Sequence, residues 1–204
     1  MRKDDKRNFN GMEDTDMNNA LNLDELKEEV IDGKVYYMSP SANPKHGRVI
    51  GNIYFVFKSY LKGKKCQVFT DTIDVYLDSE KKDKVIPDVS ILCDETKFTD
   101  KGYEGIPSLV VEVISPTSVK RDRKIKFNMY ETYNINEYWI VDPINKVIEQ
   151  YILIDGKYSL EGTYAKLADW EKEGLNEEEK VKFPEIFKTS IFSELTINID
   201  DIFE

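Results

Sequence analysis

The sequence predicts an α/β (α+β) fold in which helices pack on the faces of a mixed β-sheet. Runs of β-branched and aromatic residues bounded by turn residues indicate strands, and two amphipathic segments between them indicate helices. An Asp-Gly pair at 155–156, between two such runs, predicts an extra β-hairpin toward the C-terminus. Strands and helices in this order are typical of a sheet flanked by helices.

The expected elements follow from hydrophobic periodicity and from turn residues. A short helix is predicted over residues 21–30 and a strand over 34–40. A long amphipathic helix is predicted from Pro44 to Leu61, because apolar residues recur at helical spacing and Gly63 ends the pattern. A second helix is predicted from Ser118 to Tyr133. The other strands are expected within residues 66–78, 84–93, 108–115, 137–143 and 146–165, and residues 194–203 close the chain.

Length and composition predict one globular domain. The chain has 204 residues, of which 40% are hydrophobic and 12% aromatic, as is ordinary for a soluble globular protein. Residues 1–19 are polar and contain few large apolar groups, so we expect a disordered leader over 1–19 and a single domain over 20–204.

The sequence also predicts a cytoplasmic protein without a membrane partner. No stretch approaches the roughly 18 apolar residues that span a bilayer, and the first residues lack the apolar core of a secretory signal. Cys66 and Cys93 lie far apart, without a Cys-x-x-Cys partner or companion histidines. We therefore predict that both cysteines are core residues and that neither a zinc site nor a disulfide framework is present.

The net charge of −10 argues at first against a nucleic-acid partner, because Lys and Arg dominate phosphate binding. The acids are concentrated, however: residues 167–204 hold 11 acidic residues against 4 lysines. Within the rest, "VKRDRKIK" at 119–126 places five bases around one aspartate. Such a run is often only a solvated helix face, but it also forms a local positive patch.

Two carboxylates interrupt apolar strands. Glu112 lies within "LVVEVI", which is apolar on both faces, and an ionised carboxylate there must be paired or bound to metal. Asp88 interrupts "KVIPDVSIL" just after a proline. Together they would make a hard-oxygen site for Mg²⁺ or Mn²⁺. The alternative is that Asp88 caps a turn and Glu112 pairs with an Arg or Lys.

Lys126 is a candidate catalytic residue on the second helix. At 100° per residue it shares an arc with Asp122, Met129 and Tyr130, while Arg121 and others fall on the opposite side. A lysine on the inner face needs a nearby anion. Either Asp122 neutralises it, or it faces the metal site and stabilises charge on a phosphoryl group.

His46, the only histidine, lies on the inner face of the long helix near its start. A single histidine on an apolar face is often a hydrogen-bonded core residue. The functional alternative is that His46 binds a phosphate, acts on a water or holds Asp88 in place.

Four segments of the chain resemble one known family. "PD" at 87–88, "EVISPTS" from 112, "RDRKIKFNMY" from 121 and "INEYWIVDP" from 135 are similar to the putative restriction endonuclease family, a prokaryotic branch of the PD-(D/E)XK nuclease superfamily. The resemblance runs from about His46 to Gln150. It implies a restriction-endonuclease-like sheet, with Asp88, Glu112 and the carbonyl of Val113 as metal ligands.

One position departs from the superfamily pattern. The usual lysine lies two residues after the glutamate, where this chain has Ile114. In this branch of the superfamily the lysine typically lies on the following helix, which fits Lys126. Ahead of that helix, Ser118 or Thr117 can cap it, and free N–H groups can meet a phosphate. The predicted substrate-binding residues are Ser115, Thr117, Ser118, Asp122 and Arg123, with Asp74 as an outer acid or a plain strand residue.

These observations predict a Mg²⁺- or Mn²⁺-dependent endonuclease that hydrolyses DNA phosphodiester bonds, with Asp88, Glu112, Lys126 and His46 as its catalytic residues. One alternative is a catalytically silent nuclease-fold module for binding or assembly. Another is a structural dimer in which residues 137–143 pair edge to edge. The sequence leaves a homodimer open in each case.

Overall fold

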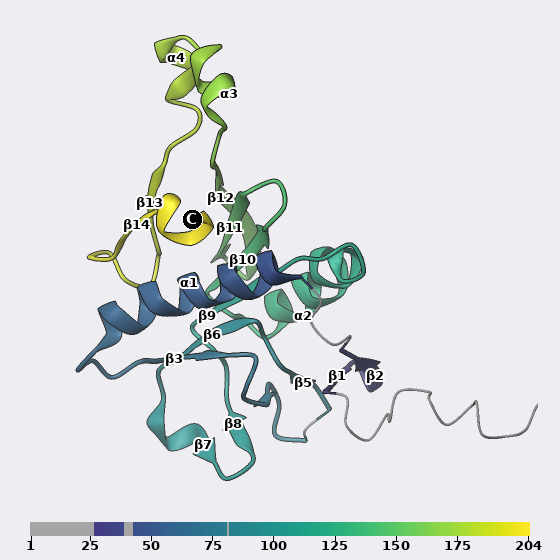
Figure 1. The fold of residues 1–204 in the computed structure, drawn as a ribbon. Helices are drawn as coiled ribbons and strands as arrows, with labels where there is room; N and C mark the ends of the chain where they lie inside the picture. The colour runs from purple at the N-terminus through teal and green to yellow at the C-terminus, as the bar shows by residue number, and fades with distance from the viewer. Residues whose placement is uncertain (1–26, 39–42, 81) are drawn as a thin grey trace, which may run out of the picture.

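A computed structural model describes residues 27–38, 43–80 and 82–204 of the chain (Figure 1). The expected leader over 1–19, and residues 21–26 of the first expected helix, lie outside these residues. The described chain forms two six-stranded sheets and a two-stranded ribbon, with helices packed on them. The predicted mixed α/β fold is confirmed, but the strands are divided between two large sheets.

The first large sheet carries the centre of the fold. Its spatial order is β12, β11, β10, β9, β6, β3. In chain order these strands are β3 (Gln67–Thr70), β6 (Val89–Leu92), β9 (Leu109–Val113), β10 (Glu137–Asp142), β11 (Val147–Ile154) and β12 (Lys157–Ala165). Strand β9 is buried along its whole length, pairs antiparallel with β6 and pairs parallel with β10. The predicted central strand, covered on both faces, is therefore confirmed.

The second large sheet lies beside the first, in the order β2, β1, β5, β4, β8, β7. Its strands are β1 (Glu28–Ile31), β2 (Lys34–Tyr37), β4 (Val75–Tyr76), β5 (Lys84–Val85), β7 (Phe98–Thr99) and β8 (Gly102–Glu104). The chain crosses from β5 in this sheet to β6 in the first sheet through Ile86, Pro87 and Asp88. The predicted strand over 84–93 is thus divided at its proline, which cannot donate a ladder hydrogen bond.

The long helix α1 (Pro44–Leu61) has the predicted bounds. Asn43 caps it by accepting a hydrogen bond from the N–H of Lys45 at 2.9 Å. Pro44 is favoured at the first helical position, because the N–H that proline lacks would have no partner within the helix there. Its buried face packs against the first sheet (Figure 1), where the rings of Phe57 and Trp139 lie 5.7 Å apart.

The remaining helical segments are short. They are η3 (Glu95–Lys97), the π-helical η4 (Arg121–Lys126), α2 (Phe127–Thr132), α3 (Asp169–Glu173), α4 (Glu177–Lys180) and α5 (Asp200–Phe203). Strands β13 (Ile186–Lys188) and β14 (Thr196–Asn198) form the ribbon near the C-terminus. Figure 1 shows α3 and α4 in a lobe that projects from the body of the molecule.

The prediction of a helix over residues 21–30 is wrong for its described end. Residues 28–31 form β1, which pairs with β2 through a turn at Asp32 and Gly33, both of which have positive φ. An Asp-Gly pair between two β-prone segments favours this hairpin turn, and this local signal outweighs the helical pattern. The same signal at Asp155–Gly156 does produce the predicted hairpin, between β11 and β12.

The second predicted helix is also irregular. Its first part is the π-helix η4, and an ordinary α-helical turn follows only from Phe127. Asp122, Lys126, Met129 and Tyr130 are buried as predicted. Arg121 was predicted to face outward, yet its side chain is only 20% exposed, because a π-helical turn holds more residues than an α-helical turn and shifts the faces.

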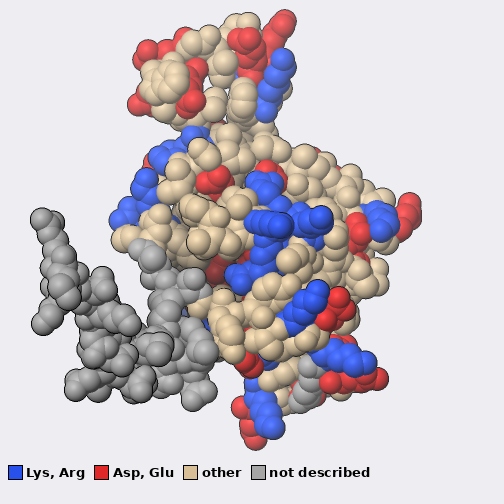
Figure 2. Space-filling model, turned by 90° about the vertical axis from the view of Figure 1, so that its right-hand side faces the viewer, with Lys and Arg blue, Asp and Glu red and all other residues tan. Residues whose placement is uncertain are grey.

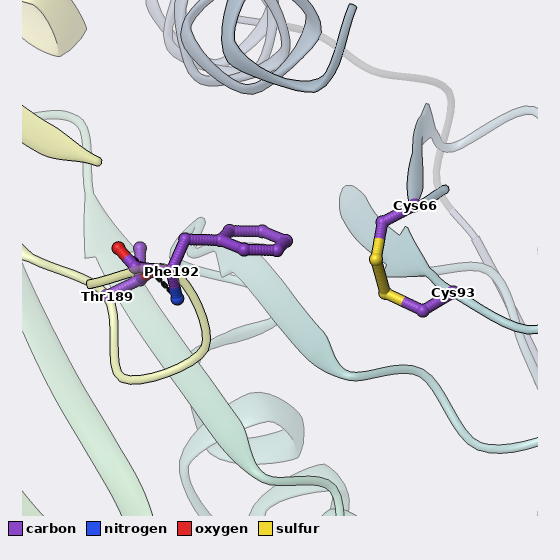
Figure 3. Close-up of a disulfide and its surroundings, with 4 residues drawn as sticks. All are labelled: Cys66, Cys93, Thr189 and Phe192. Atoms are coloured by element: carbon purple, nitrogen blue, oxygen red, sulfur yellow. Dashed lines mark hydrogen bonds between the residues drawn. A yellow bond between two sulfur atoms is a disulfide. The ribbon is translucent and has the colours of Figure 1, made fainter. Parts of the chain in front are cut away.

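The prediction that Cys66 and Cys93 are plain core residues without a disulfide is wrong. Their sulfur atoms are bonded, at an S–S distance of 2.10 Å (Figure 3). Strands β3 and β6 are antiparallel with Gln67 opposite Leu92, so the next residues along, Cys66 and Cys93, face each other. Sequence spacing conveys nothing about this register.

No helix in the described part of the chain is long and apolar enough to cross a membrane. The segment 137–143, proposed as a dimer edge, contains β10, which is paired on both sides by β9 and β11. Pairing between chains along that strand is therefore excluded.

Reduction of the disulfide should lower stability. The bond closes a loop with a sequence separation of 27, for which the loss of chain entropy in the unfolded state corresponds to about 3.5 kcal/mol. Urea denaturation with and without a reductant measures this difference. The Cys66→Ser/Cys93→Ser variant should match the reduced wild type, and coincident curves for oxidised and reduced wild type would contradict the prediction.

Candidate active site

A proline at the crossing between the sheets frees one peptide group of β9. Val89 lies opposite Val111, so the same register continued by two residues places Pro87 opposite Val113. Ile114 donates its N–H to Val141 on the β10 side, and the main-chain groups of Val113 therefore face β6. Since proline has no N–H, the carbonyl of Val113 has no ladder partner there.

Asp88 and His46 occupy this freed position. The N–H of Val113 donates to Oδ2 of Asp88 at 2.7 Å, and Nε2 of His46 lies 2.8 Å from the Val113 carbonyl oxygen. His46 Nε2 is also 3.6 Å from Asp88 Oδ2. His46 thus lies where it could hold Asp88 in place, and its role at the site stays a prediction.

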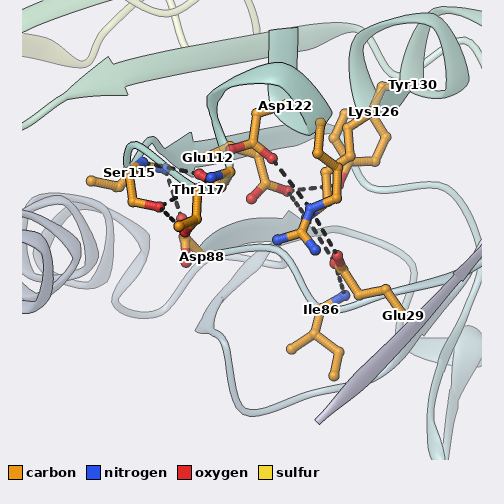
Figure 4. A network of polar contacts seen from close by, with 12 residues as sticks. Glu29, Ile86, Asp88, Glu112, Ser115, Thr117, Asp122, Lys126 and Tyr130 are labelled. Carbon is orange, nitrogen blue, oxygen red and sulfur yellow. Dashed lines mark hydrogen bonds and ion pairs between the residues drawn. The ribbon is translucent and has the colours of Figure 1, made fainter. Parts of the chain in front are cut away.

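Glu112 and Lys126 form a buried ion pair. Nζ of Lys126 lies 2.9 Å from Oε1 of Glu112, and the hydroxyl of Tyr130 donates to the same oxygen at 2.7 Å. Glu29, from β1, contacts the ammonium more closely, at 2.7 Å from Oε1 to Nζ. Figure 4 shows the lysine between these carboxylates. Asp122, which the sequence offered as the neutralising partner, makes no direct contact at this range.

Burial and charge act against each other in this cluster. Burial raises the pKa of Glu112, and the Lys126 ammonium opposes that rise. Burial also disfavours the charged form of Lys126, but Glu112, Glu29 and Asp122 outweigh it and raise the lysine pKa. Lys126 is therefore an ammonium at neutral pH, so it donates hydrogen bonds and cannot accept a proton from water.

The pKa values of two other groups are raised as well. The interaction with Asp88 raises the pKa of His46, although burial opposes it. Burial raises the pKa of Asp122. Asp88 thus raises the pKa of His46 and burial raises that of Asp122, and a cation bound in the site would oppose both shifts.

The charges of the cluster do not balance. Nε of Arg121 lies 3.9 Å from Glu29 Oε2 and 4.0 Å from Asp122 Oδ1, and all three atoms are buried without a hydrogen bond. The cluster and Asp88 beside it hold four acids, Asp88, Glu112, Glu29 and Asp122, and the cations Lys126 and Arg121, while His46 contacts Asp88. With the acids ionised and His46 neutral, four negative charges face two positive charges, which leaves the charge that one divalent cation would neutralise.

The donor atoms fit a hard divalent cation. Glu112 accepts hydrogen bonds from Lys126 and Tyr130 at Oε1, and Asp88 accepts one from the N–H of Val113 at Oδ2. Each carboxylate thus keeps its other oxygen for a ligand, and the Val113 carbonyl is a third oxygen donor. Among the described residues, no three His, Cys, Asp or Glu side chains gather as a metal site, so the set consists of two carboxylates and one main-chain carbonyl.

The other predicted site residues divide into two groups. Ser115 and Ser118 close the turn after β9 through reciprocal hydrogen bonds from N–H to Oγ of 2.9 and 3.2 Å. Thr117 lies 3.1 Å from Ser115 through their hydroxyl oxygens, and Figure 4 places both beside Asp88. This turn is thus at the site.

Two predicted residues have other partners. Nη1 and Nη2 of Arg123 donate hydrogen bonds to the carboxylate of Glu149, at 2.6 and 2.9 Å. A role of Arg123 in substrate binding would require this ion pair to open. Asp74 lies 3.7 Å from Lys84 in the second sheet and makes no contact with Asp88 or Glu112, which favours the plain strand residue.

Glu29 is a site residue that the sequence analysis does not select, because its segment is predicted there to be a short helix. Glu29 is fully buried, and besides Lys126 its Oε1 accepts the N–H of Ile86 at 3.0 Å. The available signal was the Asp-Gly pair at 32–33, which predicts a hairpin and would have placed Glu29 on a strand.

The fold and the site together define a nuclease-like protein. The model of the family described as "Uma2: Putative restriction endonuclease" matches residues 16–182. The chain therefore belongs to that family, as the resemblance of its motifs indicated.

Similar proteins extend this comparison. The chain is 27% identical over 128 residues to the uncharacterized protein sll1609 of Synechocystis sp., covering 61% of this chain and 71% of that protein. It is 28% identical over 127 residues to the uncharacterized protein slr1290 of the same organism, with 61% and 65% covered. A crystal structure of a putative nuclease belonging to DUF820 from Anabaena variabilis matches with a TM-score of 0.65 and 17% identity, over 88% of this chain and 90% of that one. This last likeness concerns the fold.

Divalent metal should stabilise the folded protein through Asp88 and Glu112. Binding to the native state alone adds about 2.7 kcal/mol at roughly 100 times the Kd, so Mg²⁺ or Mn²⁺ should raise Tm. Because burial raises the pKa of Glu112 and the ligand must be deprotonated, the effect should grow as the pH rises. Thermal melting across metal concentration and pH tests this.

The control for the metal prediction is Asp74→Asn, which removes a carboxylate outside the cluster and should keep the wild-type response. Asp88→Asn should lose most of it. A wild type whose Tm is insensitive to both metals, or an Asp88→Asn response equal to that of wild type, would contradict the shared site.

Proposed function

We propose that this protein is a divalent-metal-dependent endonuclease that hydrolyses DNA phosphodiester bonds. The observation that carries the proposal is the convergence of Asp88, Glu112 and the carbonyl of Val113, which has no partner on the neighbouring strand, beside the charged Lys126. Membership of the putative restriction endonuclease family supports it. The proposal includes four predictions: metal dependence, DNA as the substrate, a cytoplasmic location and a homodimer. The disulfide bears on the location, because such bonds are more typical of oxidising compartments.

Asp88, Glu112 and the Val113 carbonyl would hold Mg²⁺ or Mn²⁺, which supplies charge stabilisation to a phosphoryl group and its attacking water. Lys126 contributes a fixed ammonium that donates hydrogen bonds where negative charge develops. Its raised pKa argues against a role as general base. His46, at the freed carbonyl of Val113, can donate to a phosphate oxygen or hold Asp88 in its position.

Exposed bases lie on both elements that flank the site. Lys45 and Arg48 are exposed next to His46 on α1, and Lys120 and Lys124 are exposed at η4. None of these four makes an ion pair with another described residue, so each can meet a phosphate. Figure 2, viewed from the side where α2 lies, shows Lys and Arg gathered in the middle of one face.

The main alternative is a nuclease-fold module that binds without cutting. Digestion of plasmid DNA, single-stranded DNA and RNA with Mg²⁺ or Mn²⁺ tests the proposal directly. Cleavage of DNA that is abolished by Asp88→Asn supports the endonuclease. Binding of DNA without cleavage under all these conditions would favour the silent module.

Lys126→Ala and Lys124→Ala should differ sharply, although the residues are two positions apart. Lys126 is 1% exposed and contacts Glu112, whereas Lys124 is exposed. Loss of one transition-state donor costs about 10²–10³ in rate, so Lys126→Ala should slow cleavage by that factor. Lys124→Ala should cleave at nearly the wild-type rate at saturating DNA. Single-turnover rates on both variants give the comparison.

Melting temperature is measured on the same two proteins. A purely neutralising Lys126 would lower Tm while the rate per folded molecule stayed the same. An equal loss of rate in the two variants would overturn the assignment of Lys126 to the site.

Binding of nucleic acid should depend strongly on salt. Each neutralised phosphate contact contributes about one to the slope of log K against log salt, so Lys120→Ala and Lys124→Ala should each reduce the slope by about 1. Glu177 and Glu178 of the projecting lobe are exposed, and their replacement by glutamine should tighten binding. Fluorescence anisotropy between about 50 and 200 mM salt covers the useful range, and an affinity independent of salt would contradict phosphate contacts.

A further inference from the structure

Lys126 has two direct carboxylate partners, and only one of them belongs to the metal-binding set. Glu112 lies 2.9 Å from its Nζ and Glu29 lies 2.7 Å away. Glu29 is fully buried and comes from β1, in the second sheet. A carboxylate brought into the core from a separate sheet needs an explanation, because its desolvation is costly.

Glu29 is also fixed relative to Asp88. Its Oε1 accepts the N–H of Ile86 at 3.0 Å, and Ile86 is two residues before Asp88. The pairing of β1 with β5 places Val30 opposite Lys84, which anchors Glu29 to the segment that leads into Asp88. One carboxylate oxygen thus connects Lys126 with the segment between β5 and β6 that carries the proposed metal ligand Asp88.

Without Glu29, Glu112 would be the only direct anionic partner of Lys126 among the residues that the structure describes. The position of the ammonium would then be set by Glu112 alone, and the free oxygen of Glu112 is needed for a cation. With Glu29 in place, the ammonium is held from two directions. Arg121 lies 3.9 Å from the second oxygen of Glu29, too far for a hydrogen bond. Its guanidinium therefore adds positive charge near Glu29 but does not fix the position of the Glu29 carboxylate.

We propose that Glu29 is a positioning residue that holds the Lys126 ammonium at the reaction site while Glu112 remains available to the cation. The inference rests on the proposed endonuclease function. The competing account is that Glu29 only stabilises the fold, by capping the N–H of Ile86 and neutralising a buried lysine.

The chain offers a matched control in the preceding residue. Glu28 and Glu29 are adjacent on one strand and point to opposite faces. Glu28 is 45% exposed at its side chain and lies 3.6 Å from Lys84. The variants are Glu29→Gln, Glu28→Gln, Lys126→Ala and the double variant Glu29→Gln/Lys126→Ala, all in the full chain with Mg²⁺ and plasmid DNA.

Glu29→Gln should slow single-turnover cleavage about 10- to 100-fold, less than removal of the donor itself, with KM changed little. Glu28→Gln should cleave like the wild type. A residue that acts through Lys126 has no further effect once Lys126 is gone, so Glu29→Gln/Lys126→Ala should match Lys126→Ala. Unchanged cleavage in Glu29→Gln, or a full additional loss in the double variant, would overturn the proposal.

Two further measurements keep the test decisive. If Glu29→Gln does not fold, Glu29→Asp keeps the charge but shortens the side chain, and a wild-type rate in that variant would overturn the proposal. If the wild type does not cleave DNA, the endonuclease proposal fails on its own. The NMR signal of the Lys126 ammonium then reports its position. A change in Glu29→Gln but not in Glu28→Gln supports positioning, and an unchanged signal in both overturns it.

Discussion

A buried ammonium held between two buried carboxylates is the interaction on which the arrangement of this protein depends. Lys126, Glu112 and Glu29 come from three segments that are far apart in the sequence, and they meet in a region almost free of solvent. Removing one partner of such a pair typically costs about 3–5 kcal/mol. The positions of η4, β9 and β1 are therefore coupled, and the small N-terminal hairpin belongs to the site as much as the central strand does.

The second constraint is the absence of one N–H group. Pro87 stands where the chain passes from β5 to β6 and where the ladder with β9 would continue. Its missing donor frees the carbonyl of Val113 and lets Asp88 take the N–H of the same residue. The proline and aspartate of the sequence motif thus have separate tasks. The proline ends the pairing of the two strands, and the aspartate uses the space that this creates.

The parts of the fold with strong local signals were predictable from the sequence. Helix α1 has its predicted bounds because its periodicity, its Asn43 cap and its terminal glycine agree. Asp88, Glu112 and Lys126 could be selected because a charge within an apolar pattern needs a partner. The disulfide and the division into two sheets were not predictable, since both depend on the register between distant strands. Glu29 was not predicted as a site residue, because the helical pattern of its segment was given more weight than the Asp-Gly turn signal that follows it. Arg121 was assigned to the outer face, because regular α-helical periodicity does not apply to the π-helical turn in which it lies.

The energetics of the cluster favour a catalytic site rather than a module that only binds nucleic acid. Four acids and two bases surround the end of β9, with three buried polar atoms left without hydrogen bonds. Apolar residues of similar volume would often be as stable or more stable in such a position, and binding to a phosphate backbone needs only exposed bases. Apolar cores cover both faces of the sheet, so the stability of the fold does not depend on buried charge. An excess of buried negative charge is useful when a divalent cation and a phosphoryl group are brought to it, and this links the cost in stability to the proposed chemistry.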